Sequence, residues 1–239
     1  MARPRRTSDP HARGGLTLAV DVALLSVSNG ELLTPLHRQA DRWALPGVVV
    51  EPDEALDVAA RRALQTKASL RDVYLEQLFT FGAPNRAPGG RIVSVAYYAL
   101  VDRRRLETKT RGEPDVVIGR IHVPWAGETG GPVEVFASAT RDEKPLRLAL
   151  DHADILGMAV RRIRGKLDWS PIGFQLLGEK FTLLDLQRVH ETVLGRPLNK
   201  DSFRRRMLAS GELEATGETE REVDHRPAEL YRFVKRSAV

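Results

Sequence analysis

The sequence predicts a protein of the α/β (α+β) class, with a mixed sheet and helices over residues 15–168 and a smaller, helical unit after it. Two observations lead to this prediction. Segments that alternate apolar and polar residues, separated by Gly/Pro-rich turns, fill the first part of the chain. After Gly131 and Pro132, apolar residues instead recur at the three- and four-residue spacing of one helix face. The chain has 239 residues, which is enough for two cores.

The first part is expected to open with a β-hairpin. Residues 16–27 (LTLAVDVALLSV) alternate in polarity, residues 28–30 (SNG) have the composition of a tight turn, and residues 31–36 (ELLTPL) resume the strand pattern. A helix should follow within residues 43–70, capped by Asp53. Its apolar face would hold Leu56, Ala60, Ala63 and Leu64. Further strands are predicted at residues 73–81, 91–101 and 116–123.

The last part is predicted to be a winged helix-turn-helix. A helical stripe first spans residues 146–167. Thr182 and Asp185 then resemble a capping box that opens a helix ending at Gly195, and Asn199 caps a second short helix that ends at Gly211. Beyond it, a strand-like start, a polar middle and an apolar end fit a β-wing. We therefore expect a disordered basic arm at 1–14, a mixed α/β domain at 15–168 and a winged helix-turn-helix domain at 169–239.

The second short helix has the residues expected of a DNA-recognition helix. Successive helical residues rotate by about 100°, so Phe203 and Met207 should point to a core while Arg205 points nearly opposite. Arginine pairs with guanine or phosphate, and polar residues at a helix N-terminus can reach base edges. An ordinary solvated helix is the alternative, which the neighbouring helix, turn and wing disfavour. The predicted DNA contacts are Arg196, Asn199, Lys200, Ser202, Arg204, Arg205 and Arg206, with Arg3, Arg5 and Arg6 of the arm.

Composition limits the surroundings and the partners of the protein. The chain has a net charge of +5 and no cysteine, which fits a reducing compartment. Its most apolar stretch is interrupted by Asp21 and is far shorter than the roughly 20 residues of a membrane helix. We expect a cytoplasmic protein without a membrane span or a secretory signal. Residues 211–233 hold seven acidic and three basic side chains, so the predicted wing should avoid DNA phosphates.

Residues 43–70 resemble the box of the Nudix superfamily. That box reads Gly, five residues, Glu, seven residues, then Arg-Glu-apolar-any-Glu-Glu-any-Gly-apolar. Carboxylates on one face of its helix hold Mg²⁺ against a diphosphate. The chain matches this pattern at Glu54, Arg62, Leu64 and Leu70, and replaces its glycines by Val48 and Ser69. Ala63, Thr66 and Lys67 stand where the metal-binding glutamates should be, so we expect no enzyme activity, no bound metal and no cofactor.

A pocket built for a nucleoside diphosphate can still bind one after losing its metal, if basic side chains replace the ion. Basic residues lie before the box, on its helix and in the NRAPGGR segment (85–91). For each one alone, a solvated surface position is the competing interpretation. The predicted ligand-binding residues are Arg38, Arg42, Arg62, Lys67, Arg86 and Arg91.

A degenerate Nudix domain joined to a winged helix resembles the NrtR family, the Nudix-related transcriptional regulators of NAD metabolism. The resemblance covers about residues 16–234 and is strongest at 91–101, 165–177 and 181–208. It implies a homodimeric repressor that binds a palindromic double-stranded DNA operator near NAD biosynthesis or salvage genes. It also implies that residues 15–168 form an effector-binding domain, that residues 169–239 form the DNA-binding domain, and that ADP-ribose, or a related NAD metabolite, weakens DNA binding. We expect a rotation between the two domains, transmitted by the helix predicted at 146–167.

Two other functions stay open at this point. One is an active ADP-ribose or nucleoside diphosphate hydrolase that uses Glu51, Glu54 and Glu76 as non-standard metal ligands. The other is a ligand-binding adaptor whose acidic wing contacts another protein.

Overall fold

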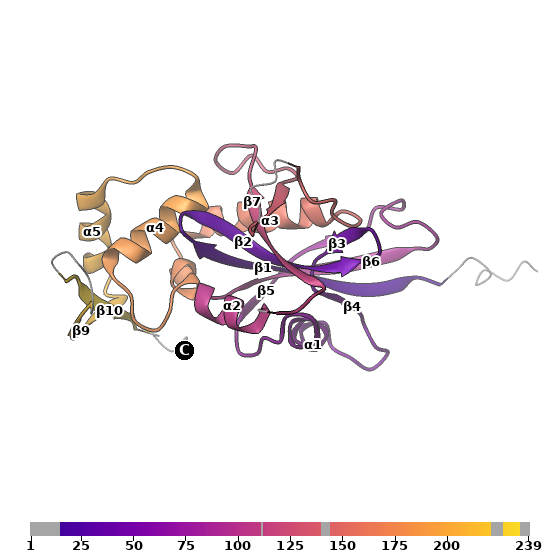
Figure 1. Ribbon diagram of the computed structural model, residues 1–239, viewed down its shortest axis with the longest axis horizontal. Coiled ribbons are helices and arrows are strands. Elements are labelled where there is room, and N and C mark those ends of the chain that lie inside the picture. The colour runs from indigo at the N-terminus through magenta and orange to yellow at the C-terminus, as the bar shows by residue number, and fades with distance from the viewer. Residues whose placement is uncertain (1–14, 111, 140–143, 221–226, 235–239) are drawn as a thin grey trace, which may run out of the picture.

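A computed structural model describes residues 15–110, 112–139, 144–220 and 227–234. Arg3, Arg5 and Arg6, which we predicted to contact DNA, lie outside these residues. Within the described ranges, eight strands form one mixed sheet, and two more form a separate hairpin near the C-terminus (Figure 1). The main path of the large sheet runs in the order β5-β6-β1-β2-β7-β8, while β3 and β4 pair with β2 and β1.

The elements of the large sheet and its helices have the following bounds. The strands are β1 (Thr17–Ser28), β2 (Glu31–Gln39), β3 (Arg42–Ala44), β4 (Gly47–Val49), β5 (Tyr74–Phe81), β6 (Ile92–Leu100), β7 (Val116–His122) and β8 (Glu134–Ala137). The helices are α1 (Leu56–Ala68), α2 (Arg103–Thr110) and α3 (His152–Lys166). We refer to β1 through α3 as the sheet region.

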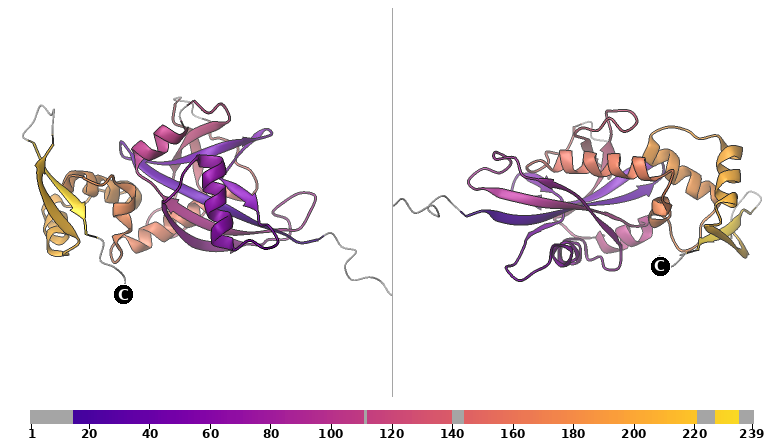
Figure 2. Two further views of the ribbon diagram at one scale, coloured as in Figure 1. Left: turned by 90° about the horizontal axis from the view of Figure 1, so that it is seen from below. Right: turned by 180° about the vertical axis from the view of Figure 1, so that it is seen from behind.

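Strand β1 is the central strand and separates two cores. It pairs with β2 in the predicted hairpin, with β6 in parallel and with β4 in antiparallel orientation. Alternate residues of β1 face opposite sides, as the pleat of a strand requires. Ala23 and Leu25 join the core under α3, whereas Val22 and Leu24 join the core under α1. Figure 2 shows α1 and α3 on opposite faces of the sheet.

The predicted helix, turn, helix and wing are confirmed. A short 3-10 helix (Pro171–Leu176) leads into α4 (Leu183–Leu194), α5 (Lys200–Ala209) and the antiparallel pair β9 (Leu213–Thr219) and β10 (Glu229–Phe233). Thr182 and Asp185 form the capping box of α4, Gly195 ends α4 with a φ of 68°, and Asn199 caps α5. We call α4 through β10 the winged-helix region. It forms the left end of the molecule in Figure 1.

The winged-helix region and the residues just before it form a small core, and α4 also contributes to the larger core. Phe174, Phe181, Phe203, Met207 and Tyr231 are all nearly fully buried together. Residues of α4 also pack into the core under α3, at Val189 and Val193. The predicted domain boundary at 168 and 169 falls just after α3 and stays a prediction.

Two expectations about helix starts are wrong. Ala55, not Asp53, is the N-cap of α1, and no side chain caps that helix. Helix α3 begins at His152, not at Leu146. The preceding residues are extended because Leu146 N–H donates to the Val135 carbonyl and Leu148 pairs with Trp43. Helix α2 and the short strands β3, β4 and β8 were not predicted. Among the described helices, none has the length and apolar character needed to cross a membrane.

Candidate functional site

The matched box residues Glu54 and Arg62 bind each other at the start of α1. Arg62 donates from Nε to Oε1 of Glu54 at 2.7 Å and from Nη2 to Oε2 at 2.6 Å. Nη2 also donates to the Val49 carbonyl at 2.9 Å. The hydrogen bonds from Arg62 hold the pKa of Glu54 below its usual value. The pair therefore fixes the loop between β4 and α1 to the first turns of the helix.

The three positions that replace the box glutamates differ in their surroundings. Ala63 is fully buried in the core between α1 and the sheet. The Thr66 hydroxyl donates to the Arg62 carbonyl at 2.8 Å, and Lys67 is exposed. Burial, together with the Lys67 charge, lowers the pKa of His37 to about 4. Among the described residues, no cluster of three or more His, Asp or Glu side chains is suitable for holding a metal ion.

The remaining acidic residues considered as non-standard metal ligands are paired with cations. Lys166 Nζ donates to the two carboxylate oxygens of Glu76 at 2.6 and 2.7 Å. Tyr74 also donates to Glu76, and Arg162 lies 3.6 Å from it. Although burial opposes the shift, the hydrogen bonds from Lys166 and Tyr74 keep the pKa of Glu76 below its usual value. Glu51 lies 3.7 Å from Arg62 Nη2.

Arg86 is the centre of a buried polar cluster that joins four parts of the sheet region. Its side chain is 2% exposed. It donates to Asp151 from Nε at 2.8 Å and from Nη2 at 2.5 Å, and Nη2 lies 3.4 Å from Asp21. Ser94 donates to Asp21 at 2.6 Å. These contacts connect the loop 82–91 to β1, to β6 and to the N-cap of α3.

His152 completes this cluster in its neutral form. Its Nδ1 accepts a hydrogen bond from the Leu45 N–H at 2.9 Å, so the proton must reside on Nε2. Nε2 lies 3.7 Å from Asp21 Oδ1. Burial lowers the pKa of His152, which keeps the ring uncharged near neutral pH. A Cβ at Gly47 would overlap the Asp21 carboxylate, so the backbone that starts the box passes directly over the cluster.

The six predicted ligand-binding residues lie on three parts of the sheet region. Arg38 and Arg42 are exposed at the paired ends of β2 and β3, where Arg38 stacks over Trp43 at 5.5 Å. Arg91 is exposed and donates to the Gly82 carbonyl at 2.7 Å. Lys67 is exposed on α1. Unlike these four, Arg62 and Arg86 form ion pairs with described carboxylates, and through them they hold other parts of the protein.

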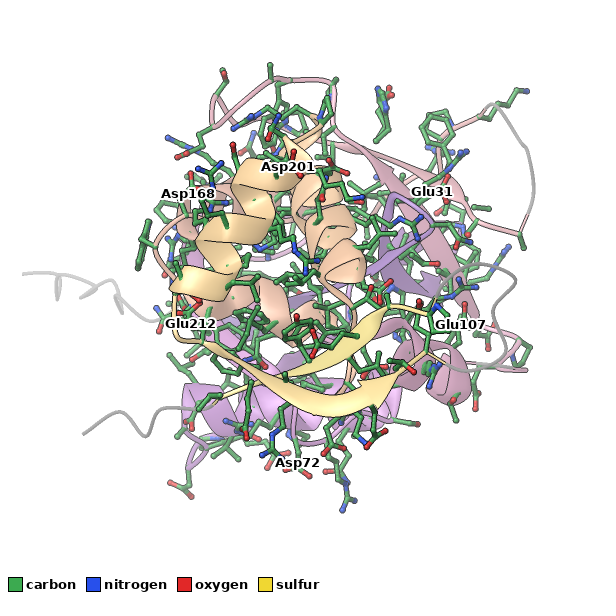
Figure 3. The ribbon with its side chains drawn as sticks, turned by 90° about the vertical axis from the view of Figure 1, so that its left-hand side faces the viewer. Glu31, Asp72, Glu107, Asp168, Asp201 and Glu212 are labelled. Atoms are coloured by element: carbon green, nitrogen blue, oxygen red, sulfur yellow. The ribbon has the colours of Figure 1, made fainter. Side chains whose placement is uncertain are left out.

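Helix α5 has one buried and one basic face, as expected. Phe203 and Met207 are 4% and 8% exposed and pack in the small core. Arg204 and Arg205 are exposed, and neither forms an ion pair with a described residue. Figure 3 shows the side of the molecule with α5 and the wing, where the labelled Asp168, Asp201 and Glu212 lie around α5.

The other predicted DNA-contacting residues differ in how free their side chains are. Arg206 donates to Asp168 at 3.0 Å and stacks on Phe203. Asn199 Oδ1 accepts a hydrogen bond from the Ser202 N–H at 3.0 Å, and Ser202 itself is exposed. Arg196 and Lys200 are exposed at the turn and at the start of α5. Arg188 on α4 is exposed too, and the capping pattern that predicts α4 carries no signal for this side chain.

Several acidic side chains of the wing are engaged locally. Glu214 pairs with Arg232 at 2.8 Å across the two strands, and Glu218 pairs with Lys180 at 2.5 Å. Glu229 accepts a hydrogen bond from the Tyr231 hydroxyl at 2.5 Å. The two ion pairs neutralise part of the negative charge that the composition of the wing suggests, whereas the hydrogen bond from Tyr231 leaves the charge of Glu229 in place.

A mixed sheet with a box helix, followed by a winged helix-turn-helix, defines the class of Nudix-related transcriptional regulators. A family model described as the NrtR DNA-binding winged helix domain matches residues 173–233. The chain is 33% identical over 223 residues to the ADPR responsive transcriptional repressor NtrR of Acinetobacter baylyi, which covers 90% of this chain and 81% of that protein. The chain belongs to the NrtR family.

One solved structure agrees with this assignment, and a second shares the fold. Shewanella oneidensis NrtR, solved in complex with a 27mer DNA, is 30% identical, with a TM-score of 0.74 over 91% of this chain and 93% of that one. A MutT/nudix family protein from Enterococcus faecalis is 23% identical, with a TM-score of 0.74 over 92% of this chain and 89% of that one. The second likeness concerns the fold alone.

Proposed function

We propose that this chain is a transcriptional repressor that binds operator DNA through its winged-helix region and is released from DNA when ADP-ribose binds its sheet region. The single observation that carries the proposal is that α5 has one buried apolar face and one exposed basic face. Phe203 and Met207 anchor it in the core, while Arg204 and Arg205 are exposed without ion-pair partners among the described residues. A helix seated in this way presents cationic side chains to a major groove.

The Acinetobacter and Shewanella relatives support ADP-ribose and DNA as the two ligands of this chain. The Acinetobacter repressor is named as ADPR responsive, and the Shewanella protein was solved with DNA. A diphosphate ligand requires cations, and four of the predicted residues have exposed side chains: Arg38, Arg42, Lys67 and Arg91. Arg62 and Arg86 would act by holding the loops on which such a ligand rests.

The proposal treats the box as a binding element and not as an active site. Ala63, Thr66 and Lys67 provide no carboxylate for Mg²⁺. Glu51, Glu54 and Glu76 are paired with Arg62 or Lys166. A metal ion would have to compete with these cations, so a hydrolase mechanism is the less favoured function.

The remaining features of the proposal follow from family membership. The repressor acts as a homodimer in the cytoplasm on a palindromic operator, and its targets are NAD biosynthesis or salvage genes. Residues 15–168 bind the effector and residues 169–239 bind DNA. The basic side chains of residues 1–14 add non-specific attraction to DNA phosphates.

Fluorescence anisotropy tests the proposal directly. Labelled promoter fragments from NAD biosynthesis genes and from the gene of this protein are titrated with protein, alone and with ADP-ribose or with NAD as a control. We expect tight, fragment-specific binding that ADP-ribose weakens and NAD does not. Equal operator affinity at saturating ADP-ribose would contradict the proposed release.

Two further measurements separate the competing functions. Mg²⁺-dependent turnover of ADP-ribose, followed by chromatography, would favour a hydrolase. Affinity for duplex DNA that does not change with salt, or no affinity, would favour an adaptor that contacts protein, because phosphate contacts produce a steep salt dependence.

A further inference from the structure

Helix α3 is attached to the sheet along its length. At its N-terminal end, Asp151 and His152 belong to the buried cluster around Arg86. In its middle, a Cβ at Gly157 would overlap the Gly131 carbonyl, so α3 lies directly against the backbone of the segment before β8. In its last turns, Lys166 and Arg162 pair with Glu76 of β5. The helix lies on one face of the sheet (Figure 2) and is fixed to the sheet region at three points, so we expect it to move with that region.

Arg164 reaches from α3 in the other direction, toward the winged-helix region. The residue is 6% exposed. Its Nε donates to the Val193 carbonyl at 2.7 Å, and its Nη1 donates to the Gly127 carbonyl at 2.8 Å and lies 3.4 Å from the Trp125 carbonyl. Its guanidinium stacks on the Trp125 ring at 4.8 Å. No described carboxylate forms an ion pair with it, and burial lowers the pKa of its guanidinium.

The contact to Val193 supplies a partner that α4 cannot supply itself. Val193 lies in the last turn of α4, and the residue four positions later is Pro197, which has no N–H to donate. Among the described residues outside α4 itself, Arg164 is the donor to this buried carbonyl. The negative end of the α4 dipole also lies here, and it favours a cation. Arg164 therefore caps the C-terminus of α4.

The capped end of α4 is also the start of the turn that leads to α5. Gly195 begins this turn, and a Cβ at Gly195 would lie 3.1 Å from Arg164 Nη2. A cavity of about 550 Å³ adjoins the same point and is lined by Arg164, Thr192 and Gly195 together with residues of β7, β8 and the β1–β2 turn. The end of α4 is thus held by the hydrogen bond from Arg164 and by the packing of Val193 in the larger core, and it has free space beside it.

We propose that Arg164 is the positioning residue that sets the orientation of the helix-turn-helix relative to the sheet region, and so determines how strongly the effector changes operator affinity. This inference rests on the proposed function. A buried guanidinium is tolerated only where its donors are satisfied, so it keeps the carbonyls of residues 125, 127 and 193 at fixed separations. A shift of α3 or of the β7–β8 connection then moves the end of α4, and α5 moves with the turn.

The test compares the full-length chain with Arg164→Gln, Arg164→Lys and the control Arg161→Gln. Arg161 is exposed on the same helix and forms no ion pair with a described residue. Operator affinity is measured by anisotropy with and without ADP-ribose, and ADP-ribose affinity is measured by calorimetry. We expect Arg164→Gln to reduce the effector-induced change in operator affinity by at least about fivefold, with ADP-ribose affinity unchanged. Arg161→Gln should behave as the unmodified chain.

A distance measurement tests the positioning role without relying on the effector. The chain has no cysteine, so Gln65→Cys on α1 and Leu208→Cys on α5, both exposed, can take spin labels selectively. We expect a narrow distance distribution with Arg164, a broad one with Arg164→Gln and an intermediate one with Arg164→Lys. Lysine keeps the positive charge but lacks the planar guanidinium group that donates to several carbonyls at once. Arg164→Lys serves as the test if Arg164→Gln does not fold.

The outcomes separate the two proposals. A distribution that stays narrow without Arg164, or an effector response that stays unchanged, overturns the positioning role. If ADP-ribose does not change the operator affinity of the unmodified chain, but Arg164→Gln still broadens the spin-label distance distribution, the proposed function fails and the positioning role stands.

Discussion

Arg62 and Glu54 form a two-point pair, with Nε to Oε1 at 2.7 Å and Nη2 to Oε2 at 2.6 Å. Both residues belong to the part of the Nudix box that this chain retains. A bidentate pair of this kind fixes orientation as well as distance. Because Ala63, Thr66 and Lys67 replace the glutamates of the same box, the pair preserves the shape of the loop and helix without the carboxylates that would hold a metal.

Glu54→Gln tests whether this pair serves the fold or a metal. We expect a lower melting temperature, because an amide offers one oxygen where Arg62 needs two. Millimolar Mg²⁺ should leave the melting temperatures of the unmodified chain and the variant unchanged. Calorimetric melting with and without Mg²⁺ measures both effects, with the exposed Glu113→Gln as the control. A Mg²⁺-induced rise that only the unmodified chain shows would identify Glu54 as a metal ligand.

The elements that sequence analysis located correctly are specified by neighbouring residues. The β1–β2 hairpin follows from alternating polarity around Asn29 and Gly30, which both adopt positive φ. The caps of α4 and α5 follow from side chains that bond to backbone groups three residues away. Such local signals are present in any short segment of the sequence, so they could be recognised without knowledge of the fold.

The predictions from sequence that the structure does not match concern segments whose conformation depends on residues far away in the chain. Residues 146–150 have the apolar spacing of a helix, yet the Trp43 backbone, more than one hundred positions away, draws Leu148 and Ala149 into extended pairing. The sequence alone suggests that Arg86 of the candidate site is an unpaired cation available to a ligand. Its carboxylate partners Asp21 and Asp151 each lie 65 positions away. Only the folded chain brings these groups together.

Gly157→Ala tests the close packing of α3 against the sheet region. The new methyl group would overlap the Gly131 carbonyl, a backbone atom, so the helix or the β7–β8 connection must shift. We expect a loss of about 3 kcal/mol in the free energy of unfolding, measured by urea denaturation.

Gly165→Ala on the same helix is the matched control. Its Cβ would meet the end of the flexible, exposed Glu128 side chain at 2.9 Å, which can move away. Because alanine favours a helix over glycine by about 1 kcal/mol, stability should stay level or rise. Equal losses for the two variants would show that α3 does not depend on the close approach at Gly157.

His190 should make stability depend on pH in the weakly acidic range. It is 4% exposed on α4 and packs against Phe203 at a ring distance of 5.0 Å. Burial, and then the Arg206 charge, lower its pKa from 6.5 to about 4. Below its ordinary pKa the unfolded chain binds a proton that the folded chain does not. The contribution of His190 to the free energy of unfolding is therefore complete above about pH 6.5 and is lost as the pH falls toward 4.

We expect His190 alone to account for about 2 kcal/mol of lost stability between pH 7 and pH 5. Urea denaturation at the two pH values measures this loss. His190→Leu should reduce it, whereas His122→Gln at an exposed position should not. His37, whose pKa is also lowered to about 4, adds to the remaining slope. An identical pH dependence in the leucine variant would assign the effect to other groups.

The three arginines of α5 should differ in what they contribute to DNA binding. Arg205 projects away from Phe203 and Met207, so we expect Arg205→Ala to remove the preference for operator over scrambled sequence, through loss of a base contact. Arg204→Ala and Arg206→Ala should weaken binding to both sequences and lower the salt slope by about 1, as loss of a phosphate contact does. Anisotropy titrations at several salt concentrations distinguish the two patterns.

Arg61→Ala, which removes an exposed arginine from α1, controls for the change in net charge. It should leave the preference for operator intact and alter the salt slope little, because α1 lies beside the sheet and α5 lies at the other end of the molecule (Figure 1). A preference for operator that survives Arg205→Ala would mean that the base-reading side chains lie elsewhere, with Ser202 and Lys200 at the start of α5 as the next positions to substitute. An equal loss of affinity at the two sequences would instead assign Arg205 to the phosphate backbone.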